Sequence, residues 1–370
     1  MNAAIVPPLP AAAEATLAES PLDESPLVVG GRTMPSRYFL APLAGYTQLA
    51  FRRAIRELGG LGLATTDLVH ARMLVDERPK SLQLVATTDD DAPLSVQIFG
   101  GRPQEIAAAA RWLEDHGYAG IDINMGCPMA KVTGVGGGAR LMCDAGGAAG
   151  LVQAVLDAVT LPVSVKMRLG WDQSARTAPA LARAFRDLGV CAITIHGRTR
   201  AQGFGGSVDW DGIAETVDAA DGIPVIGNGD VRTPEQARQM RRATGCAAVA
   251  IGRGAMLDPW IFRELGDAAF TQPNAEERLS FLARHVRLMI AQHGEYGCVL
   301  VRKFAAWYGA VIGLSDAIED RLRRLDSPEA FEALLTKATD EASDEATRCP
   351  LPPRPPTALL KVPNGPVERW

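Results

Sequence analysis

With 370 residues the chain can form one large domain and a smaller one, and its 47% hydrophobic and 22% charged residues are typical of a globular protein. The sequence has no run of about 20 uncharged apolar residues, which excludes a membrane span, and its six cysteines show no CxxC pair, which argues against a disulfide framework or a structural zinc site. The net charge of −5 argues against nucleic-acid binding by overall charge, so any such binding needs a local basic patch.

The first 30 residues are rich in Ala, Pro and Glu and have no periodic apolar face. We therefore predict a disordered N-terminal extension over residues 1–30. Pro7, Pro8 and Pro10 interrupt its apolar run and no basic segment precedes that run, so it does not resemble a signal peptide. Together with the cysteine usage, this predicts a cytoplasmic protein. We expect a monomer.

Eight short apolar segments come next, each bounded by turn residues, and such segments are typical of buried parallel strands. They begin near Tyr38, Leu63, Leu94, Gly120, Pro162, Cys191, Pro224 and Ala247. Amphipathic helical segments lie between them, most clearly at 47–58, 103–115 and 234–243. This alternation predicts an α/β fold, a (β/α)₈ or TIM barrel over residues 31–268, with a doubly wound open sheet as the alternative.

Beyond Trp260 only helical patterns occur, so we predict a small all-helical domain over residues 269–342. The end of the chain is rich in proline, which predicts a disordered tail over residues 343–370. The basic residues of the helical part are either a positive surface for nucleic acid or ordinary solvated faces. They are Arg278, Arg284, Arg287, Arg302, Lys303, Arg321, Arg323 and Arg324.

The carboxyl ends of the predicted strands are unusually polar or rich in glycine. In a (β/α)₈ barrel the active site is built there and in the loops after the strands. Seven of the eight strand ends have this character: 41–45, 97, 122–128, 166–168, 196–198, 228–230 and 252–254. We therefore expect the functional site at this end of the barrel.

The last two strand ends predict a phosphate site. Gly229 and Gly252 let the backbone approach an anion closely, and the loops after strands seven and eight are the usual phosphate site of this fold. Arg253 adds a charge-assisted contact. Lys166 lies inside an apolar strand and needs an anionic partner, which is either a bound ligand or a structural ion pair.

Strand four supplies the candidate acid. Asp122 and Asn124 are two residues apart and share one face of the strand, whereas Ile121 and Ile123 face the other way. Cys127 lies at the start of the longest loop. A thiol can act as a general acid near neutral pH, although a cysteine taken alone is more often a small buried residue.

Two other features carry less weight. The segment 134–139 fits the GxGxxA dinucleotide fingerprint, but it lies well past its strand and opens no βαβ unit, so we interpret it as a loop. The five histidines show no metal-ligand spacing, and no metal site is expected. His70, His116, His285 and His293 are interpreted as ordinary surface or satisfied residues, while His196 lies at a strand end.

The chain resembles the tRNA-dihydrouridine synthases from about residue 35 to about residue 339. The MGCP stretch is highly specific, whereas GNGD and IGRG alone indicate only a flavin barrel. RKFAAWY resembles the helical domain of the bacterial B-type enzymes, and the loop 132–139 is closer to the C-type, which leaves the target uridine open. The segments that carry the resemblance are APLAGYTQLAFR, VQIFGGRP, IDINMGCPMAKV, VKMRLGW, ITIHGRTR, PVIGNGDV and AIGRGAMLDPWIF.

The resemblance implies an enzyme with bound FMN, reduced by NADPH or NADH, that acts on uridine in tRNA. Hydride would pass from flavin N5 to C6 of the uracil, and Cys127 would protonate C5. Lys166 would stabilise the negative edge of the reduced flavin, Asn124 and Arg198 would meet the extruded uridine, and the helical domain would clamp the tRNA. The residues implied to hold FMN are Pro42, Leu43, Ala44, Gln97, Lys166, His196, Asn228, Gly229, Asp230, Gly252 and Arg253.

Two other functions are weighed beside this one. The first is an FMN barrel that acts on a small molecule, such as a relative of the dihydroorotate or dihydropyrimidine dehydrogenases, which would not need the helical domain. The second is a non-catalytic RNA-binding module that kept the barrel. The presence of Cys127, Lys166 and Asn228 argues against the second.

Overall fold

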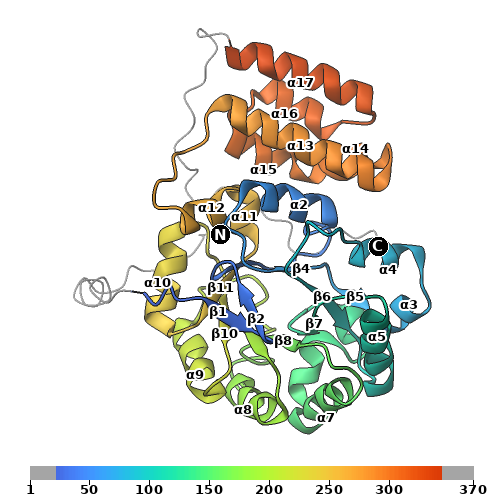
Figure 1. The fold of residues 1–370 in the computed structure, drawn as a ribbon, viewed down its shortest axis with the longest axis vertical. Coiled ribbons are helices and arrows are strands. Elements are labelled where there is room, and N and C mark those ends of the chain that lie inside the picture. Colours follow the sequence, from blue (N-terminus) through green and yellow to red (C-terminus); the bar gives the residue numbers. More distant parts are fainter. Residues whose placement is uncertain (1–21, 344–370) are drawn as a thin grey trace.

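The computed structural model describes residues 22–343, in which a barrel is joined to a bundle of C-terminal helices (Figure 1). Most of the two predicted terminal extensions lies in residues 1–21 and 344–370, outside the described residues. Within the described part, no helix has both the length and the hydropathy needed to cross a membrane.

Eight parallel strands form the barrel, and all eight were predicted from the sequence. Each strand pairs with the next along the chain, β4 pairs with β6, and β11 pairs with β3, which closes the ring. The predicted (β/α)₈ barrel is therefore confirmed. The strands are β3 (Tyr38–Leu40), β4 (Ala64–Thr65), β6 (Leu94–Phe99), β7 (Ile121–Met125), β8 (Val163–Arg168), β9 (Ala192–His196), β10 (Val225–Asn228) and β11 (Ala248–Ile251).

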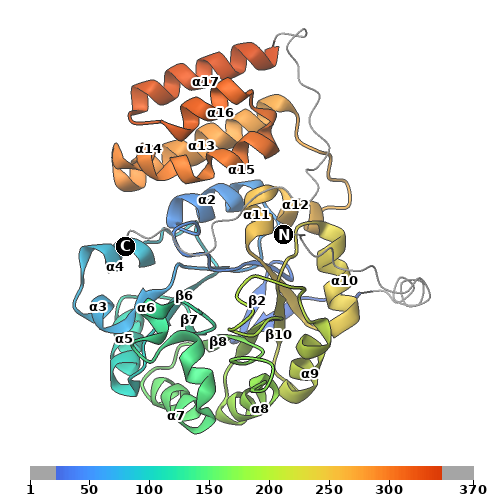
Figure 2. The same ribbon diagram turned by 180° about the vertical axis from the view of Figure 1, so that it is seen from behind.

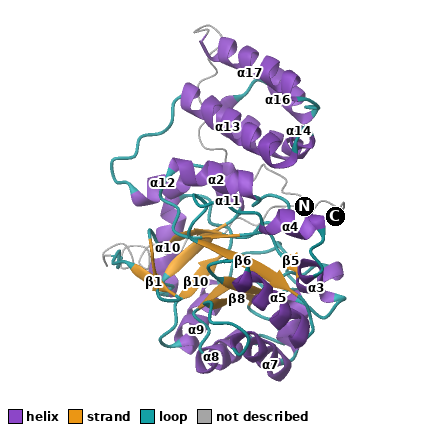
Figure 3. Cartoon of the chain, turned by 45° about the vertical axis from the view of Figure 1, so that its right-hand side comes forward, coloured by secondary structure: helices purple, strands orange, loops and turns teal. Residues whose placement is uncertain are grey.

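Helices cover the outside of this ring (Figures 2 and 3). Ile121 and Ile123 of β7 are buried, as are Leu113 of α5 and Leu151 of α7, and all four belong to one hydrophobic core. The alternate residues of β7, Asp122 and Asn124, face the barrel interior, which makes that interior polar along β7. The helices are α2 (Leu49–Leu58), α3 (Ala71–Val75), α4 (Pro79–Val85), α5 (Pro103–Asp115), α6 (Ala130–Thr133), α7 (Ala145–Leu156), α8 (Ala178–Leu188), α9 (Trp210–Ala220) and α10 (Pro234–Thr244), with the 3₁₀ helix η1 (Gly138–Cys143) before α7.

An antiparallel hairpin at the base of the barrel was missed. β1 (Leu27–Val29) and β2 (Arg32–Met34) pair through a turn at Gly30 and Gly31, which both have positive φ. Ordered structure thus begins inside the segment that we predicted to be disordered to residue 30. The sequence carries part of the signal, since Gly-Gly directly after a short apolar run is typical of a tight hairpin turn, although the second strand, Arg32–Met34, is mostly polar.

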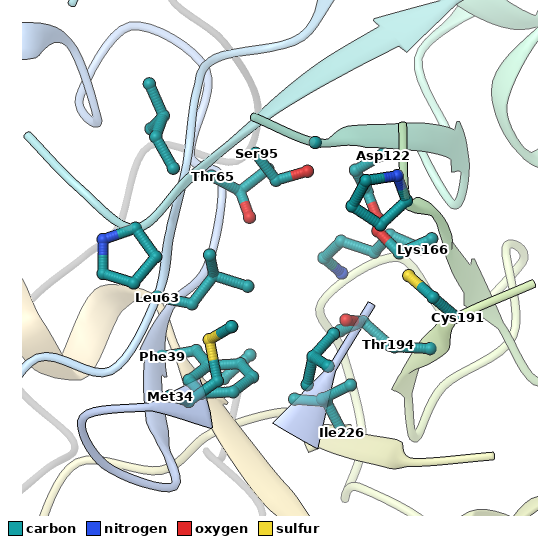
Figure 4. Close-up of a pocket in the computed structure, with 18 of the residues that line it drawn as sticks. Met34, Phe39, Leu63, Thr65, Ser95, Asp122, Lys166, Cys191, Thr194 and Ile226 are labelled. Atoms are coloured by element: carbon teal, nitrogen blue, oxygen red, sulfur yellow. The ribbon is translucent and has the colours of Figure 1, made fainter. Parts of the chain in front are cut away.

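The hairpin caps a small cavity of about 60 Å³ inside the base of the barrel (Figure 4). Met34 lies beside Phe39 at one side of this cavity, while Asp122 and Lys166 lie together at another. The hairpin therefore gives the lower end of the barrel its own hydrophobic cluster, which includes Leu27 and Met34.

The described chain after β11, up to residue 343, contains helices and no strand. A capping box formed by Asn274 and Glu277 starts the longest helix. That helix, α13, packs against α2 of the barrel and places the bundle over β3 and β11. The elements are α11 (Arg253–Leu257), α12 (Ile261–Gly266), α13 (Ala275–His293), α14 (Tyr296–Val301), η2 (Arg302–Phe304), α15 (Ala305–Tyr308), η3 (Gly309–Gly313), α16 (Asp316–Arg323) and α17 (Pro328–Ser343).

A half-buried lysine joins the bundle to the barrel. Lys303 of η2 donates a hydrogen bond to the Gly45 carbonyl, and it faces the buried Asp67 carboxyl. That carboxyl accepts hydrogen bonds from the Thr47 hydroxyl at 2.7 Å and the Gly45 amide at 2.6 Å. Burial lowers the pKa of Lys303 to about 8 and raises the pKa of Asp67. The helical segment thus holds the loop after β3 through its backbone.

Replacing Lys303 with Met should lower the free energy of unfolding by about 3 kcal/mol, because Asp67 would stay buried without its cation. Arg284→Ala, which removes the exposed pair with Glu57 across the same interface, should change it by under about 1 kcal/mol. Urea unfolding followed by circular dichroism measures both changes. Equal effects of the two substitutions would contradict the role given to Lys303.

Candidate active site

A cavity of about 560 Å³ opens at the carboxyl ends of the barrel strands. Of the residues that the sequence resemblance implies for the acid, the cofactor and the substrate, all except Arg198 line it, whereas Asp122 of strand four does not. From strands one to four and their loops come Pro42, Leu43, Ala44, Gln97, Asn124 and Cys127; from strands five to eight and their loops come Lys166, His196, Asn228, Gly229, Asp230, Gly252 and Arg253. The barrel therefore brings together residues that lie more than 200 positions apart in the sequence.

A chain of buried hydrogen bonds runs from the barrel interior to Cys127. Asp122 accepts from the Ser164 hydroxyl and from Gln97 Nε2, each at 2.7 Å. Gln97 Oε1 accepts from Asn124 Nδ2 at 2.8 Å, and Asn124 Oδ1 accepts from the Cys127 amide at 2.9 Å. Three side chains of β6 and β7 thus connect an interior carboxyl group to the start of the cysteine loop.

Asp122, at the buried end of this series of hydrogen bonds, sets the orientation of the amide groups along it. Burial raises the pKa of Asp122, while its hydrogen bonds with Gln97 and Ser164 and the charge of Lys166 lower it by smaller amounts. In its ionised form Asp122 has no proton to donate, so it pairs with Gln97 only through the amide NH₂ of Gln97. The Gln97 oxygen then points to Asn124 and selects the NH₂ of that side chain in turn. The oxygen of Asn124 is left to hold the Cys127 and Gly126 amides. Asp122 therefore orients Asn124 without touching it.

The Cys127 thiol lies in a cavity surrounded by cations. Burial raises the pKa of the thiol, while the charges of Arg168, Lys131 and Lys166 lower it by smaller amounts. The net shift is upward, so the thiol keeps its proton at neutral pH. The same cations would stabilise the thiolate that remains after the proton is given away. The site therefore suits a general acid better than a nucleophile.

The side chains of Lys166 and His196 line the cavity and offer it polar atoms. Lys166 Nζ donates to Asn228 Oδ1 at 3.1 Å, and Asn228 Nδ2 donates to the Ala250 carbonyl at 2.7 Å, which fixes that amide too. Burial lowers the pKa of Lys166 to about 8. Burial and nearby cations hold the pKa of His196 well below its ordinary value, so its ring is neutral. His196 Nε2 has no partner within residues 22–343.

The end of the cavity at β10 and β11 is lined by the backbone of Gly229 and Gly252 and by the cationic side chain of Arg253. A Cβ added at Gly229 would lie 2.8 Å from Val208 and 3.2 Å from His196, so a larger residue does not fit there. Asp230 pairs with both Arg253 and Arg198. Arg253 faces the cavity, whereas Arg198 is buried and also donates to the carbonyls of Gly205 and Gly206.

Several lining residues were missed in the sequence. His70 was interpreted as an ordinary residue, but it lines the cavity, and its Nδ1 is buried without a partner in the described chain. It ends the short strand β5 (Val69–His70), which the apolar pattern does not reveal. Trp307 comes from α15, so no strand-end rule could find it. The missed lining residues include Tyr46, His70, Met73, Lys80, Lys131, Phe204, Arg232 and Trp307.

Comparison with known proteins agrees with the resemblance noted in the sequence. Residues 39–343 match the family model described as dihydrouridine synthase (Dus). The chain belongs to the dihydrouridine synthase family. Within the described residues no cluster of three or more potential metal ligands occurs.

Individual relatives are covered over nearly their whole length. The "probable tRNA-dihydrouridine synthase" of Rickettsia conorii is 37% identical over 316 residues, 84% of this chain and 95% of the relative. The tRNA-dihydrouridine synthase B of Xanthomonas axonopodis pv. citri is 36% identical over 332 residues, 86% of this chain and 99% of the relative.

Histamine dehydrogenase from Rhizobium sp. 4-9 is similar in fold alone, with a TM-score of 0.53, 11% identity and coverage of 86% of this chain and 64% of that chain.

Asp122→Ala should lower the free energy of unfolding by about 2–3 kcal/mol, because Ser164 and Gln97 lose a buried acceptor. Asp122→Asn should cost less than half of that, since its oxygen can face Gln97 and its NH₂ can face the Ser164 hydroxyl. The rate at which iodoacetamide alkylates Cys127, followed by peptide mass spectrometry, should change in Asp122→Ala and stay near the wild-type rate in Asp122→Asn. An unchanged rate in both variants would contradict the link between Asp122 and the cysteine loop.

Proposed function

We propose that this protein reduces the C5–C6 double bond of uridine in tRNA, with FMN as its bound cofactor, NADPH or NADH as its reductant and Cys127 as its acid. The single observation that supports it best is the position of Cys127 in the same cavity as Lys166, His196 and Asn228, where burial raises the pKa of its thiol. The names of the relatives support the substrate class.

The cavity fits an FMN molecule in size and chemistry. Its volume lies within the range of small-molecule and cofactor sites, roughly 300–1,000 Å³. Lys166 and the unpartnered His196 Nε2 offer polar contacts for the carbonyl and nitrogen edge of a flavin ring. Arg253, with the narrow backbone at Gly229 and Gly252, would hold the phosphate. Pro42, Leu43, Ala44, Gln97, Asn228 and Asp230 would complete the cofactor-binding set.

Bound FMN would supply hydride to C6 of the uracil. Cys127 then gives its proton to C5, so that NAD(P)H and one proton are consumed for each double bond reduced. Arg168, Lys131 and Lys166 stabilise the thiolate that is left until solvent returns the proton. Asn124 holds the Cys127 backbone and faces the same cavity, which places it to contact the base as well.

The sequence resemblance implies a substrate contact for Arg198, and the contacts of its side chain support a positioning role instead. Its guanidinium is buried and binds Asp230 at 2.5 Å and two carbonyls of the following loop. We propose that it holds that loop and Asp230 in place, while Arg168 and Asn124 face the nucleobase. The base itself must be extruded from its stack to reach the cavity, at a cost of a few kcal/mol.

The alternative of a small-molecule substrate is less well supported. Trp307, from the C-terminal helices, lines the cavity together with the barrel residues. A barrel that acts on a free pyrimidine would not need this segment. The two functions differ in a direct assay, because only the small-molecule enzyme would oxidise NADPH faster when free uracil or orotate, whose C5–C6 double bonds can accept hydride, is added.

Cys127→Ala should reduce dihydrouridine formation on unmodified tRNA by at least about 100-fold, since the proton donor is lost. FMN content and tRNA affinity should stay near wild type, because the thiol binds neither. Nucleoside mass spectrometry measures the product, and Cys143→Ala, at an exposed cysteine 16 positions along the same loop, is the matched control. Undiminished product with Cys127→Ala would refute the acid assignment.

Arg253→Ala should release FMN, because the phosphate loses its charged partner and Asp230 is left to repel it. The purified variant should have lost most of its visible flavin absorbance and regain it only at high added FMN. Arg183→Ala, at an exposed arginine on α8, removes the same charge far from the cavity and should stay yellow. A yellow Arg253→Ala protein would overturn the phosphate site.

A further inference from the structure

The basic residues of the C-terminal helices are largely committed to partners inside the protein. Arg284 and Arg287 pair with Glu57 and Glu332, and Lys303 is half-buried against the barrel. Of the eight basic residues named in the sequence, seven bind a carboxylate or a backbone carbonyl: Arg278, Arg284, Arg287, Arg302, Lys303, Arg323 and Arg324. In a chain of net charge −5, a further cationic surface for RNA must therefore come from elsewhere.

Two arginines without an acidic partner gather on one tryptophan at the barrel mouth. The guanidinium carbon of Arg200 lies 4.5 Å from the centre of the Trp171 ring, and that of Arg140 lies 5.8 Å from it. Arg140 is exposed and the other two residues are half-buried. Neither arginine forms an ion pair within the described residues, and Arg200 Nε has no hydrogen-bond partner there.

The nearest acid in the sequence does not neutralise this group. Asp172 follows Trp171 directly, but its carboxylate accepts from the hydroxyl and amide of Ser174 and from the Ala175 amide. Those hydrogen bonds lower its pKa, and no arginine contributes to the shift. No carboxylate in residues 22–343 therefore forms an ion pair with Arg140 or Arg200, of which Arg140 is exposed and Arg200 half-buried.

The position of this stack is set by the barrel topology. Arg140, Trp171 and Arg200 lie in the segments after β7, β8 and β9. In the closed ring, β7 and β8 lie opposite β11 and β3, over which the C-terminal helices pack. Figure 1 shows α7 and α8 at the end of the molecule away from α13–α17. The Ala139 amide donates a hydrogen bond to the Cys127 carbonyl at 3.0 Å. Arg140 is therefore the direct sequence neighbour of a residue that contacts the backbone of Cys127.

We propose that Arg140, Trp171 and Arg200 bind the phosphate backbone of the tRNA strand where it leaves the barrel mouth, opposite the C-terminal helices. This inference rests on the proposed function. Stacking on the indole restrains both guanidiniums and leaves their N–H edges free to grip phosphate oxygens in pairs. When a base is extruded, its strand must be bound on both sides of the cavity. The stack provides the binding site on the side opposite the C-terminal helices.

The test compares two double variants of the FMN-loaded full-length protein. Arg140→Ala with Arg200→Ala removes the stack, and Arg111→Ala with Arg183→Ala removes the same charge from exposed arginines on α5 and α8. Affinity for an unmodified tRNA transcript is measured across a range of salt concentrations. NADPH oxidation without tRNA reports whether the cofactor site is intact.

The stack variant should bind tRNA about ten-fold more weakly at low salt, and its plot of log affinity against log salt should be shallower by about 1.4, from two lost contacts to single-stranded phosphates. The control pair should show neither change. Arg140→Ala alone, at an exposed side chain, should give about half the change in slope and guards against misfolding of the double variant. Equal behaviour of the two double variants would overturn the inference.

These outcomes are separate from those of the proposed function. If the wild-type protein forms no dihydrouridine on the transcript, the proposed function fails. If it does, and the stack variant binds and reacts like the control pair, only the phosphate contact fails. Trp171→Leu adds a finer distinction, because it should weaken binding while leaving the salt dependence unchanged.

Discussion

The structure of the site depends on a carboxyl group that no ligand touches. Asp122 lies inside the barrel, where it can only accept hydrogen bonds while it is ionised, and this property sets the orientation of Gln97 and then of Asn124. Two amide side chains that could each adopt either orientation are therefore held in one. The cysteine loop begins on the last of them. The register of β6 against β7 is what makes this possible, since it pairs Gln97 with Asp122 across the strands.

The second constraint is the concentration of positive charge in a desolvated cavity. Lys166, Arg168 and Arg253 all have lowered pKa values because burial removes their hydration, and Asp230 compensates only Arg253 and Arg198. Such a site is poorly satisfied without an anionic ligand. A phosphate and an electron-rich ring would supply the missing negative charge, and the neutral His196 accommodates them without adding to the repulsion.

The sequence predicts the barrel well because each strand is a short apolar run, and the ends of those runs share one rim in any closed parallel ring. Pro42, Asn124 and Arg253 could be brought together by that rule alone. Three features could not be found in this way. His70 ends the short strand β5, which no apolar run of its own marks in the sequence. Trp307 reaches the cavity only through tertiary packing. The pairing of Arg284 and Arg287 with distant glutamates depends on contacts between segments, which composition does not encode.

The position of Trp307 also affects the design of chimaeric proteins from this family. One wall of the cavity belongs to a helix that is synthesised about 180 residues after Cys127, so the pocket is incomplete until nearly the whole described chain has emerged. Grafting the C-terminal helices of one relative onto the barrel of another would therefore alter the shape around the nucleobase along with the surface offered to RNA. Chimaeras made to redirect the enzyme to a different uridine should be judged on turnover as well as on target choice.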